Sequence, residues 1–401
     1  MAEIKKVAFV HGEFPIGGAE RVTCDIAAAL LERGGYEVYV FVREYNPELL
    51  PSNLASDNRF HVIVSPTLGN VKLKKNWEFL LDGVRANGIS TVVFVMMSQN
   101  DVVEELHRMG CKTIYANHNI PYWEIYRKRQ LARLNSHKGL VKAAKYYLTK
   151  YLRYEKTNML ERRYRKRYIK SVNVFDDYMV LCEGYRDQIV RDLKLSSNHI
   201  MHMHVIPNMQ KPVADVCYDK RKEFLYVGRL SYPDKRIDRL IDAWRMIYDK
   251  LPDWSLVIVG DGPDAKRLKS LAKGLPRVSF EGYKSPDEYY RRASALCLVS
   301  EYEGWGLCLT EAQANGVIPI AMECSAGVRT IVEPSGVNGF LCPKGDVEAF
   351  ARQMLDFAMM DAGAVMKMRH NVVKKSLEYS PERIGELWRQ LFDKLIAARK
   401  S

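Results

Sequence analysis

Short apolar runs alternate with longer helical patterns along this chain, and this alternation sets the fold class. In the first half, runs rich in β-branched and aromatic residues predict six strands, and the first helical pattern covers residues 19–33. The six runs are Val7–His11, Glu37–Val42, His61–Ser65, Thr91–Met97, Thr113–Asn117 and Asp177–Cys182. Because strands and helices alternate, we expect a parallel sheet with helices on both faces.

A second alternation follows a polar, charged stretch that begins after Val205–Asn208 and reaches Lys222, and this stretch is typical of an interdomain linker. Its six runs are Phe224–Val227, Leu256–Val259, Val278–Phe280, Ala295–Val299, Pro319–Ala321 and Gly339–Leu341. The 401 residues suffice for two domains of roughly 200 residues each. The sequence therefore predicts an α/β protein with two doubly wound, Rossmann-like domains facing across a cleft, and ligands at the carboxyl ends of the strands.

Composition excludes several classes of protein. No apolar stretch approaches the ~20 residues of a transmembrane helix, and the first run, Val7–His11, is too short for a signal peptide. The eight cysteines are scattered, with no C-x2-C pair, and most lie in apolar surroundings typical of buried, reduced thiols. We therefore expect a cytoplasmic protein.

The segment 300–312, with the sequence SEYEGWGLCLTEA, combines a glycine turn with the start of a helix. Gly304 and Gly306 free the backbone, so that main-chain N–H groups can approach a ligand closely. The helix expected from about Leu307 presents unpaired N–H groups and a positive dipole end to that ligand. Phosphate is the kind of group that such a turn binds.

Two carboxylates frame this turn, Glu303 in the loop and Glu311 in the helix. They suit the hydroxyls of a sugar, although two solvated acids near a helix start would look the same. With seven residues between them, they resemble the E-x7-E motif of the retaining, GT-B glycosyltransferases of family 4 (glycosyl transferases group 1). Three further motifs of that family occur in its order: GGxER at 17–22, VGRL…K at 224–236 and VGDGP at 256–263. By these four motifs the chain is identified as a member of this family, and it resembles the bacterial capsular, exopolysaccharide or lipopolysaccharide type.

The resemblance implies an acceptor domain over 1–210, completed by a C-terminal helix over 381–401, and a nucleotide-sugar-binding domain over 211–380. It implies transfer of a hexosyl or N-acetylhexosaminyl group from a nucleotide-sugar, UDP before GDP, to a lipid-linked or cell-surface glycan. We expect no cofactor and no metal, because no D-x-D motif occurs in a suitable loop and two cations take the metal's place. Two alternatives stay open: a nucleotide-sugar epimerase of the same architecture, and a basic, non-catalytic binding module.

The departing diphosphate needs cations, because negative charge builds up on its leaving oxygen. Arg229 follows an apolar run and can bind phosphate oxygens bidentately, while Lys235 supplies a point charge. The neighbouring Arg236 leaves the register of this lysine open. The resemblance places Glu303 near the transferred sugar and Glu311 at the ribose hydroxyls. It assigns these residues to the donor: Gly18, Arg229, Lys235, Gly282, Tyr283, Glu303, Gly304, Trp305, Gly306, Leu307 and Glu311.

In the first domain, Gly17 and Gly18 precede a helix whose amides can meet a phosphate or the acceptor. Glu20 belongs to this loop, or is an ordinary residue of a first helical turn. His118 ends a predicted strand, and the family often has a histidine in such a place near the donor sugar. We expect it to hydrogen-bond sugar hydroxyls, beside Glu303, Arg229 and Lys235, and not to act as a general base; His11 is a weaker candidate.

Positive charge is concentrated in one segment, Tyr122–Lys170. It holds sixteen Lys or Arg residues and three acids, a net of +13 that equals the charge of the whole chain. Tyrosines and a tryptophan lie between the basic residues, a combination that suits an anionic membrane surface. We expect this insert to dock the protein on the inner face of the cell membrane. The expected contacts are Arg162, Arg163, Arg165, Lys166 and Arg167. A solvated basic face would look the same, whereas for nucleic acid no recognised binding module is present.

Overall fold

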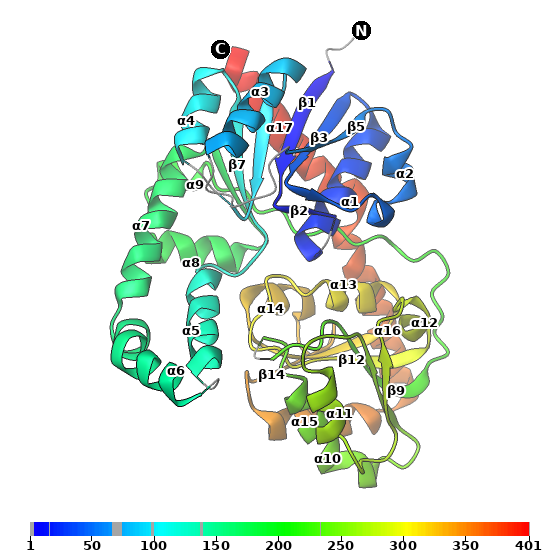
Figure 1. Cartoon of the computed structure of the whole chain (residues 1–401). Coiled ribbons are helices and arrows are strands. Elements are labelled where there is room, and N and C mark those ends of the chain that lie inside the picture. Colours follow the sequence, from blue (N-terminus) through cyan, green and yellow to red (C-terminus); the bar gives the residue numbers. More distant parts are fainter. Residues whose placement is uncertain are drawn as a thin grey trace. The chain divides into compact units, whose positions relative to one another are not determined.

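The computed structural model describes residues 4–15, 17–65, 74–97, 100–136, 139–232 and 234–400. The chain divides into two compact units (Figure 1). Unit 1 consists of Met1–Met209 and Ile384–Ser401, and unit 2 of Gln210–Arg383. The divisions lie within three residues of the boundaries expected from the sequence.

Unit 1 is built on a six-stranded parallel sheet with the order β5-β3-β1-β6-β7-β8. The strands are β1 (Lys5–Val10), β3 (Tyr36–Val42), β5 (Phe60–Val64), β6 (Thr91–Val95), β7 (Lys112–Asn117) and β8 (Asp177–Val180). Their apolar residues are buried in nearly continuous runs, as expected for a parallel sheet covered on both faces. The two-residue strands β2 (Glu13–Phe14) and β4 (Glu44–Tyr45) pair separately.

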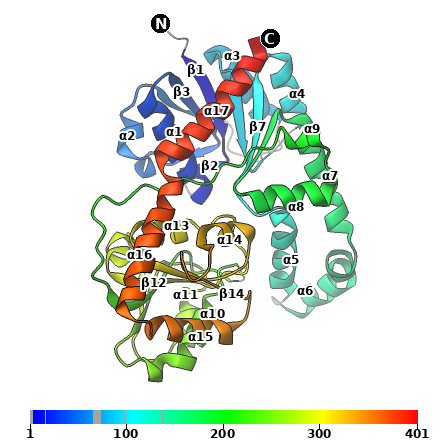
Figure 2. The ribbon, with the colours of Figure 1, turned by 180° about the vertical axis from the view of Figure 1, so that it is seen from behind.

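Helices follow these strands along the chain. They are α1 (Gly18–Arg33), α2 (Ser52–Ala55), α3 (Lys74–Asn87), α4 (Asn100–Arg108), α8 (Glu183–Leu193) and α9 (Ser197–Ile200). The C-terminal helix α17 (Pro381–Lys400) adds a further cover, in red in Figure 2. Its Trp388 and Phe392 contact the Phe9 ring of β1, with ring centroids 6.2 and 6.5 Å away. Asp393 also accepts a hydrogen bond from Tyr36 at 2.8 Å.

The basic segment folds into a helical extension of unit 1, which we call the arm. It consists of α5 (Trp123–Ser136), α6 (Leu140–Lys145), the π-helical segment η2 (Tyr146–Lys156) and α7 (Met159–Val174). In Figures 1 and 2, α6 lies at the end of the arm that is remote from the sheet of this unit. Leu160, Tyr164 and Tyr168 form the buried side of α7, one turn apart as a helix requires.

Unit 2 repeats the topology with the order β11-β10-β9-β12-β13-β14. Its strands are β9 (Arg221–Val227), β10 (Ser255–Val259), β11 (Val278–Gly282), β12 (Ala293–Leu298), β13 (Ile318–Met322) and β14 (Phe340–Cys342). Its helices are α10 (Ile237–Ile247), α11 (Ala265–Leu271), α12 (Asp287–Arg292), α13 (Leu307–Ala314), α14 (Ala326–Val332), α15 (Val347–Ala358) and α16 (Ala362–Ser376).

Both sheets thus run in the order third, second, first, fourth, fifth and sixth strand. This is the order of a Rossmann-type doubly wound sheet, so the α/β class predicted from the sequence is confirmed. In each sheet the connections change direction between the first and the fourth strand. Ligands of such sheets bind at this switch point, beyond the carboxyl ends of the strands. In unit 2 the switch point lies between β9 and β12.

Candidate active site

Three residues with predicted catalytic roles lie together at the switch point of unit 2. Arg229 and Lys235 follow β9, and Glu303 follows β12, the strand that pairs with β9. The parallel pairing brings both loops to one edge of the sheet, although 68 residues separate Lys235 from Glu303.

Two glycine turns fix the course of the chain at this edge. Gly228 donates its N–H to the Val259 carbonyl at 3.0 Å, and Leu230 donates to the Asp261 carbonyl at 2.9 Å. A Cβ added to Gly260, where φ is 135°, would lie 1.9 Å from the carbonyl oxygen of Gly228. The turns after β9 and β10 therefore pack backbone against backbone, which leaves no room for a side chain at this position.

An ion pair joins the two loops of the site. Lys235 Nζ lies 2.6 Å from Glu303 Oε1, and the Ser300 hydroxyl donates to the same oxygen at 2.6 Å. Glu303 is only 9% exposed. Burial disfavours the charged form of Lys235, but the Glu303 carboxylate outweighs it, so the pKa of Lys235 lies above its usual value. Lys235 is therefore a fixed cation at neutral pH.

The structure also separates Lys235 from its neighbour Arg236, which the sequence left open. The Arg236 guanidinium binds Asp238 at 2.9 Å, at the start of α10, and does not take the place of Lys235 beside Glu303. Arg229 is exposed, and its own carbonyl accepts a hydrogen bond from the Tyr226 hydroxyl at 3.2 Å. Its backbone is thus held while its guanidinium faces solvent.

Helix α13 begins where the glycine turn predicts, with Leu307 as its first residue. Gly306 precedes it with φ of 94°, a left-handed conformation that favours glycine. Gly304 lies in the bend before it. The Trp305 side chain is 3% exposed and packs edge-on against Tyr379, so this residue can offer its main chain to a ligand but not its indole face.

Two further predicted residues lie at the edge of unit 2. Glu311, in the second turn of α13, accepts a hydrogen bond from the Tyr290 hydroxyl at 2.7 Å, which orients its carboxylate. Tyr283 follows β11 and is 89% exposed, next to Gly282 with φ of 74°. An exposed ring at a strand end can stack on a planar ligand.

In unit 1, the predicted residues gather near the carboxyl ends of β1 and β7. His11 Nε2 lies 2.8 Å from the Thr23 hydroxyl, and His11 Nδ1 lies 3.7 Å from Glu20 Oε1. Gly17, with φ of 116°, precedes α1, and Gly18 is its first residue; both are exposed. The N–H groups at the start of this helix are therefore accessible to an anion.

His118 is buried and belongs to the same neighbourhood. Its Nδ1 lies 3.0 Å from Asn208 Oδ1, and within the described part of the chain its Nε2 has no hydrogen-bond partner. Burial lowers the pKa of His118 to about 4, so the ring is neutral at pH 7. With the proton on Nδ1 facing Asn208, Nε2 is a hydrogen-bond acceptor, which suits the hydroxyl-binding role expected from the sequence.

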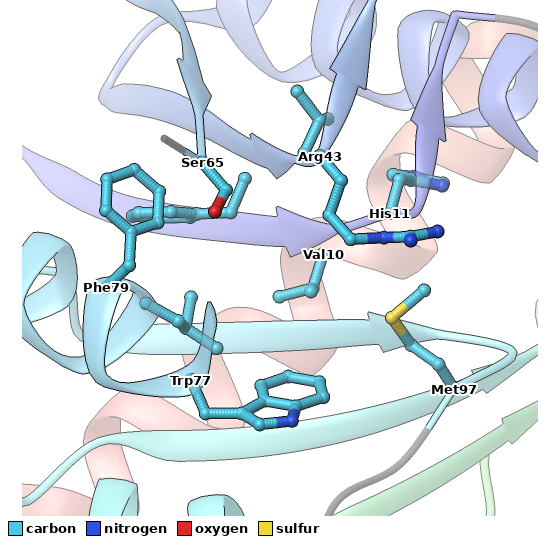
Figure 3. A pocket seen from close by; sticks show the side chains of 10 residues that line it. Val10, His11, Arg43, Ser65, Trp77, Phe79 and Met97 are labelled. Atoms are coloured by element: carbon cyan, nitrogen blue, oxygen red, sulfur yellow. The ribbon is translucent and has the colours of Figure 1, made fainter. Parts of the chain in front are cut away.

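A mainly apolar pocket opens beside His11 in unit 1 (Figure 3). Its walls come from β1, from the segments that end β3, β5 and β6, and from α3. The lining residues are Val10, His11, Phe41, Val42, Arg43, Ser65, Trp77, Phe79, Leu80 and Met97. A guanidinium and an imidazole thus border an apolar hollow, an arrangement able to take a ligand with both polar and apolar parts.

The five basic residues expected at a membrane lie on α7. Arg162, Arg163, Arg165, Lys166 and Arg167 are all exposed. Arg165 also donates to the carbonyl of Asp192.

None of the helices in the described ranges has the length and hydropathy needed to cross a bilayer. Nor do the described residues include a group of three or more His, Cys, Asp or Glu side chains placed to hold a metal ion.

Sequence reasoning missed the residues that support the predicted ones. Ser300, Tyr290 and Asn208 each hydrogen-bond a predicted side chain, yet none of them belongs to one of the four family motifs. Ser300 could have been found, because it opens the segment 300–312 and lies three residues before Glu303 in the loop after β12. Asn208 lies 90 residues from His118, and no local signal links them.

The glycine turns and the acidic loop all fall within residues 211–378, and this region matches the family model described as glycosyl transferases group 1. Unit 2 is a group 1 glycosyl transferase domain. The family predicted from the sequence is thereby confirmed for this part of the chain.

Relatives extend the similarity. An uncharacterized glycosyltransferase of Haemophilus influenzae is 32% identical over 229 residues, which cover 55% of this chain and 62% of the relative. The lipopolysaccharide 1,6-galactosyltransferase of Salmonella typhimurium is 26% identical over 231 residues, which cover 53% of this chain and 60% of the relative. This chain therefore spans less than two thirds of the length of either relative.

Solved structures resemble the whole fold. The lipopolysaccharide outer core galactosyltransferase WaaB in its apo form has a TM-score of 0.67 at 19% identity, over 97% of this chain and 99% of that chain. Anabaena HepE in complex with UDP and glucose has a TM-score of 0.70 at 16% identity, over 97% and 100%. At such identities the likeness establishes the fold, which is the GT-B fold expected from the sequence.

Proposed function

We propose that this protein is a retaining glycosyltransferase that moves a sugar from a UDP-sugar to a lipid-linked or cell-surface glycan. The observation that carries the proposal is the Lys235–Glu303 pair at the switch point of a group 1 domain, with Arg229 in the same loop as Lys235. The names of the relatives, among them lipopolysaccharide and amylovoran glycosyltransferases, favour a bacterial surface glycan as the product.

In this mechanism Arg229 and Lys235 neutralise the diphosphate as the bond from the anomeric carbon to its oxygen breaks. They take the place of a divalent metal. The Glu303 carboxylate offsets positive charge at the anomeric carbon, while the acceptor hydroxyl attacks from the same face and gives its proton to the departing phosphate. The N–H groups before and within the first turn of α13 bind the sugar and the phosphate.

Other residues orient the donor. Glu311, held by Tyr290, binds the ribose hydroxyls, and the exposed Tyr283 ring stacks on the base. In unit 1, the neutral His118 accepts a hydrogen bond from a sugar hydroxyl, and the loop at Gly17 and Gly18 contacts the acceptor or a phosphate. His118 does not act as a general base in this mechanism, because its pKa is too low for efficient proton abstraction near pH 7.

The test is the release of nucleoside diphosphate from a panel of UDP- and GDP-sugars, in EDTA, with and without a membrane lipid extract. We expect release from one donor, dependent on the extract. Isomerisation of the sugar without an acceptor would instead identify an epimerase. Absence of both reactions across the panel, with or without Mg²⁺, would leave a basic binding module as the better description.

We further propose that the arm holds the protein on an anionic membrane surface, where a lipid-linked acceptor resides. The acids of the arm are engaged within it. Glu155 and Glu161 bind Arg133 and Arg129, each at 2.6 Å, and Glu124 accepts a hydrogen bond from a tyrosine hydroxyl at 3.2 Å. The remaining positive charge is therefore free to attract anionic lipid.

The end of the arm adds apolar surface to this charge. Val141 and Leu148 are 83% and 81% exposed, and Tyr147 beside them is also exposed. Lys142 and Lys145 lie between Val141 and Leu148 in the chain and are exposed as well. Apolar side chains that would enter the acyl boundary thus lie next to cations that would remain at the headgroups. The sequence predicts the whole insert, Tyr122–Lys170, as the contact and names five basic residues of α7; we propose that α6 and η2 supply its apolar part.

Replacing Val141 and Leu148 together with serine should weaken binding to vesicles of phosphatidylcholine and phosphatidylglycerol about 30-fold, because each apolar side chain contributes about 1 kcal/mol on partial burial. Co-sedimentation measures the effect. Serine in place of Met359, which is exposed on unit 2, serves as the control and should leave binding unchanged. Equal binding to vesicles of phosphatidylcholine alone, or no effect of 0.5 M salt, would refute an electrostatic membrane contact.

A further inference from the structure

A buried arginine ties helix α10 to the loop that carries Glu303. Arg239, in the first turn of α10, is buried. Its Nη2 lies 2.6 Å from Glu301 Oε2, and its Nη1 donates to the Val299 carbonyl at 3.3 Å. One planar guanidinium therefore holds both the main chain at the end of β12 and the side chain two residues before Glu303.

Glu301 is the hub of a larger cluster. Its Oε1 lies 3.0 Å from Lys344 Nζ, after β14, and Arg236 Nη1 lies 3.9 Å from its Oε2. Partial burial alone would raise the pKa of Glu301, but hydrogen bonds from Lys344 and Arg239 lower it below the usual value. The carboxylate thus stays charged and connects three elements of unit 2, namely α10, β12 and the turn after β14.

The same residue reaches the loop that carries Lys235. The Glu301 N–H donates to the Asp234 carbonyl at 2.7 Å, and Asp234 in turn accepts a hydrogen bond from Ser231 at 2.8 Å. Asp234 directly precedes Lys235, and Glu301 lies two residues before Glu303. Any shift of Glu301 is therefore transmitted to both members of the 2.6 Å ion pair.

We propose that Arg239, acting through Glu301, is a positioning residue that sets the Lys235 ammonium and the Glu303 carboxylate at their working distance. This inference rests on the proposed function, because it gives Lys235 and Glu303 their roles at the donor. Rigid support of this kind matters, since a displacement of about 1 Å in a catalytic group can cost up to about 100-fold in rate. A lysine at 239 could reach Glu301 but could not bind it and the Val299 carbonyl in one plane.

The test compares kcat and the donor KM of the wild type with those of Arg239→Met, Arg239→Lys and Glu301→Gln. We expect Arg239→Met to lower kcat about 10- to 100-fold while the donor KM changes less than about 3-fold, because the groups that bind donor remain present. Arg239→Lys should recover part of this loss. The double variant Arg239→Met/Glu301→Gln should be no slower than the worse single variant, because both act through one contact.

Arg245→Met is the matched control. Arg245 lies on α10 too, but it binds Asp242 and the Leu271 carbonyl at the surface, so its loss should leave kcat unchanged. Wild-type kcat in Arg239→Met, or additive losses in the double variant, would overturn the inference. A fall in kcat matched by Arg245→Met would do the same. Should Arg239→Met not fold, the partly exposed Glu301→Gln carries the test alone. Failure of the wild type to release nucleoside diphosphate from any donor would contradict the proposed function instead.

Discussion

Replacing Lys235 with alanine should lower the rate of nucleoside diphosphate release about 10²–10³-fold, by analogy with the loss of one preorganised donor. The variant loses the half-buried cation that the proposed mechanism places at the leaving diphosphate. It also leaves Glu303 without its ammonium partner at 2.6 Å, in a position where water can replace that partner only in part. The measurement is kcat at saturating donor, together with the thermal midpoint, to show that the fold is retained.

Two comparisons separate this effect from a general loss of charge. Lys269→Ala removes a lysine on the exposed side of α11 and should leave the rate unchanged. Arg229→Ala should lower the rate by a similar factor of about 10²–10³ without affecting stability, because this side chain is exposed. A loss of less than about 5-fold in Lys235→Ala would mean that the diphosphate is stabilised elsewhere.

Replacing Gly260 with alanine, which adds one methyl group, should lower the free energy of unfolding of unit 2 by about 3–5 kcal/mol. Left-handed backbone strain contributes about 1–2 kcal/mol, and overpacking adds about 1–3 kcal/mol or more. The overpacking is severe here, because the new Cβ would lie 1.9 Å from the carbonyl oxygen of Gly228. The Gly260 N–H is bonded to the Gly282 carbonyl at 2.8 Å, which opposes a shift of this turn. Urea unfolding of the Gly260→Ala variant measures the effect.

Gly274→Ala is the control that isolates the clash from the strain. Gly274 also has a positive φ, 82°, but no atom outside its chain neighbours would lie within 4 Å of a Cβ added there. It should therefore cost about 1–2 kcal/mol. Equal losses in the two variants would show that the contact between the two turns is not tight. At the site, Gly260→Ala should also raise the donor KM, because the turn that it displaces packs against the turn that carries Arg229.

The sequence by itself determined the elements of the fold. All twelve predicted parallel strands are present, because each is marked by a run of apolar or β-branched residues that needs no distant partner to be seen. In the last helix the buried residues, Ile384, Trp388, Leu391, Phe392 and Leu395, likewise recur at the spacing of one helix face. The start of α13 at Leu307 followed from the glycine that precedes it.

Which residues meet was decided by the tertiary structure. Lys235 and Arg236 are adjacent cations that composition does not distinguish, yet one binds Glu303 and the other binds Asp238. Trp305 belongs to the sequence of the acidic loop, but packing turns its ring inward. Such contacts depend on which strand ends are neighbours in the sheet, and the order of strands is a property of the folded chain that local patterns do not carry. The residues that carry the chemistry could therefore be predicted from the sequence. The order of the strands in the folded sheet decided which of these residues contact one another.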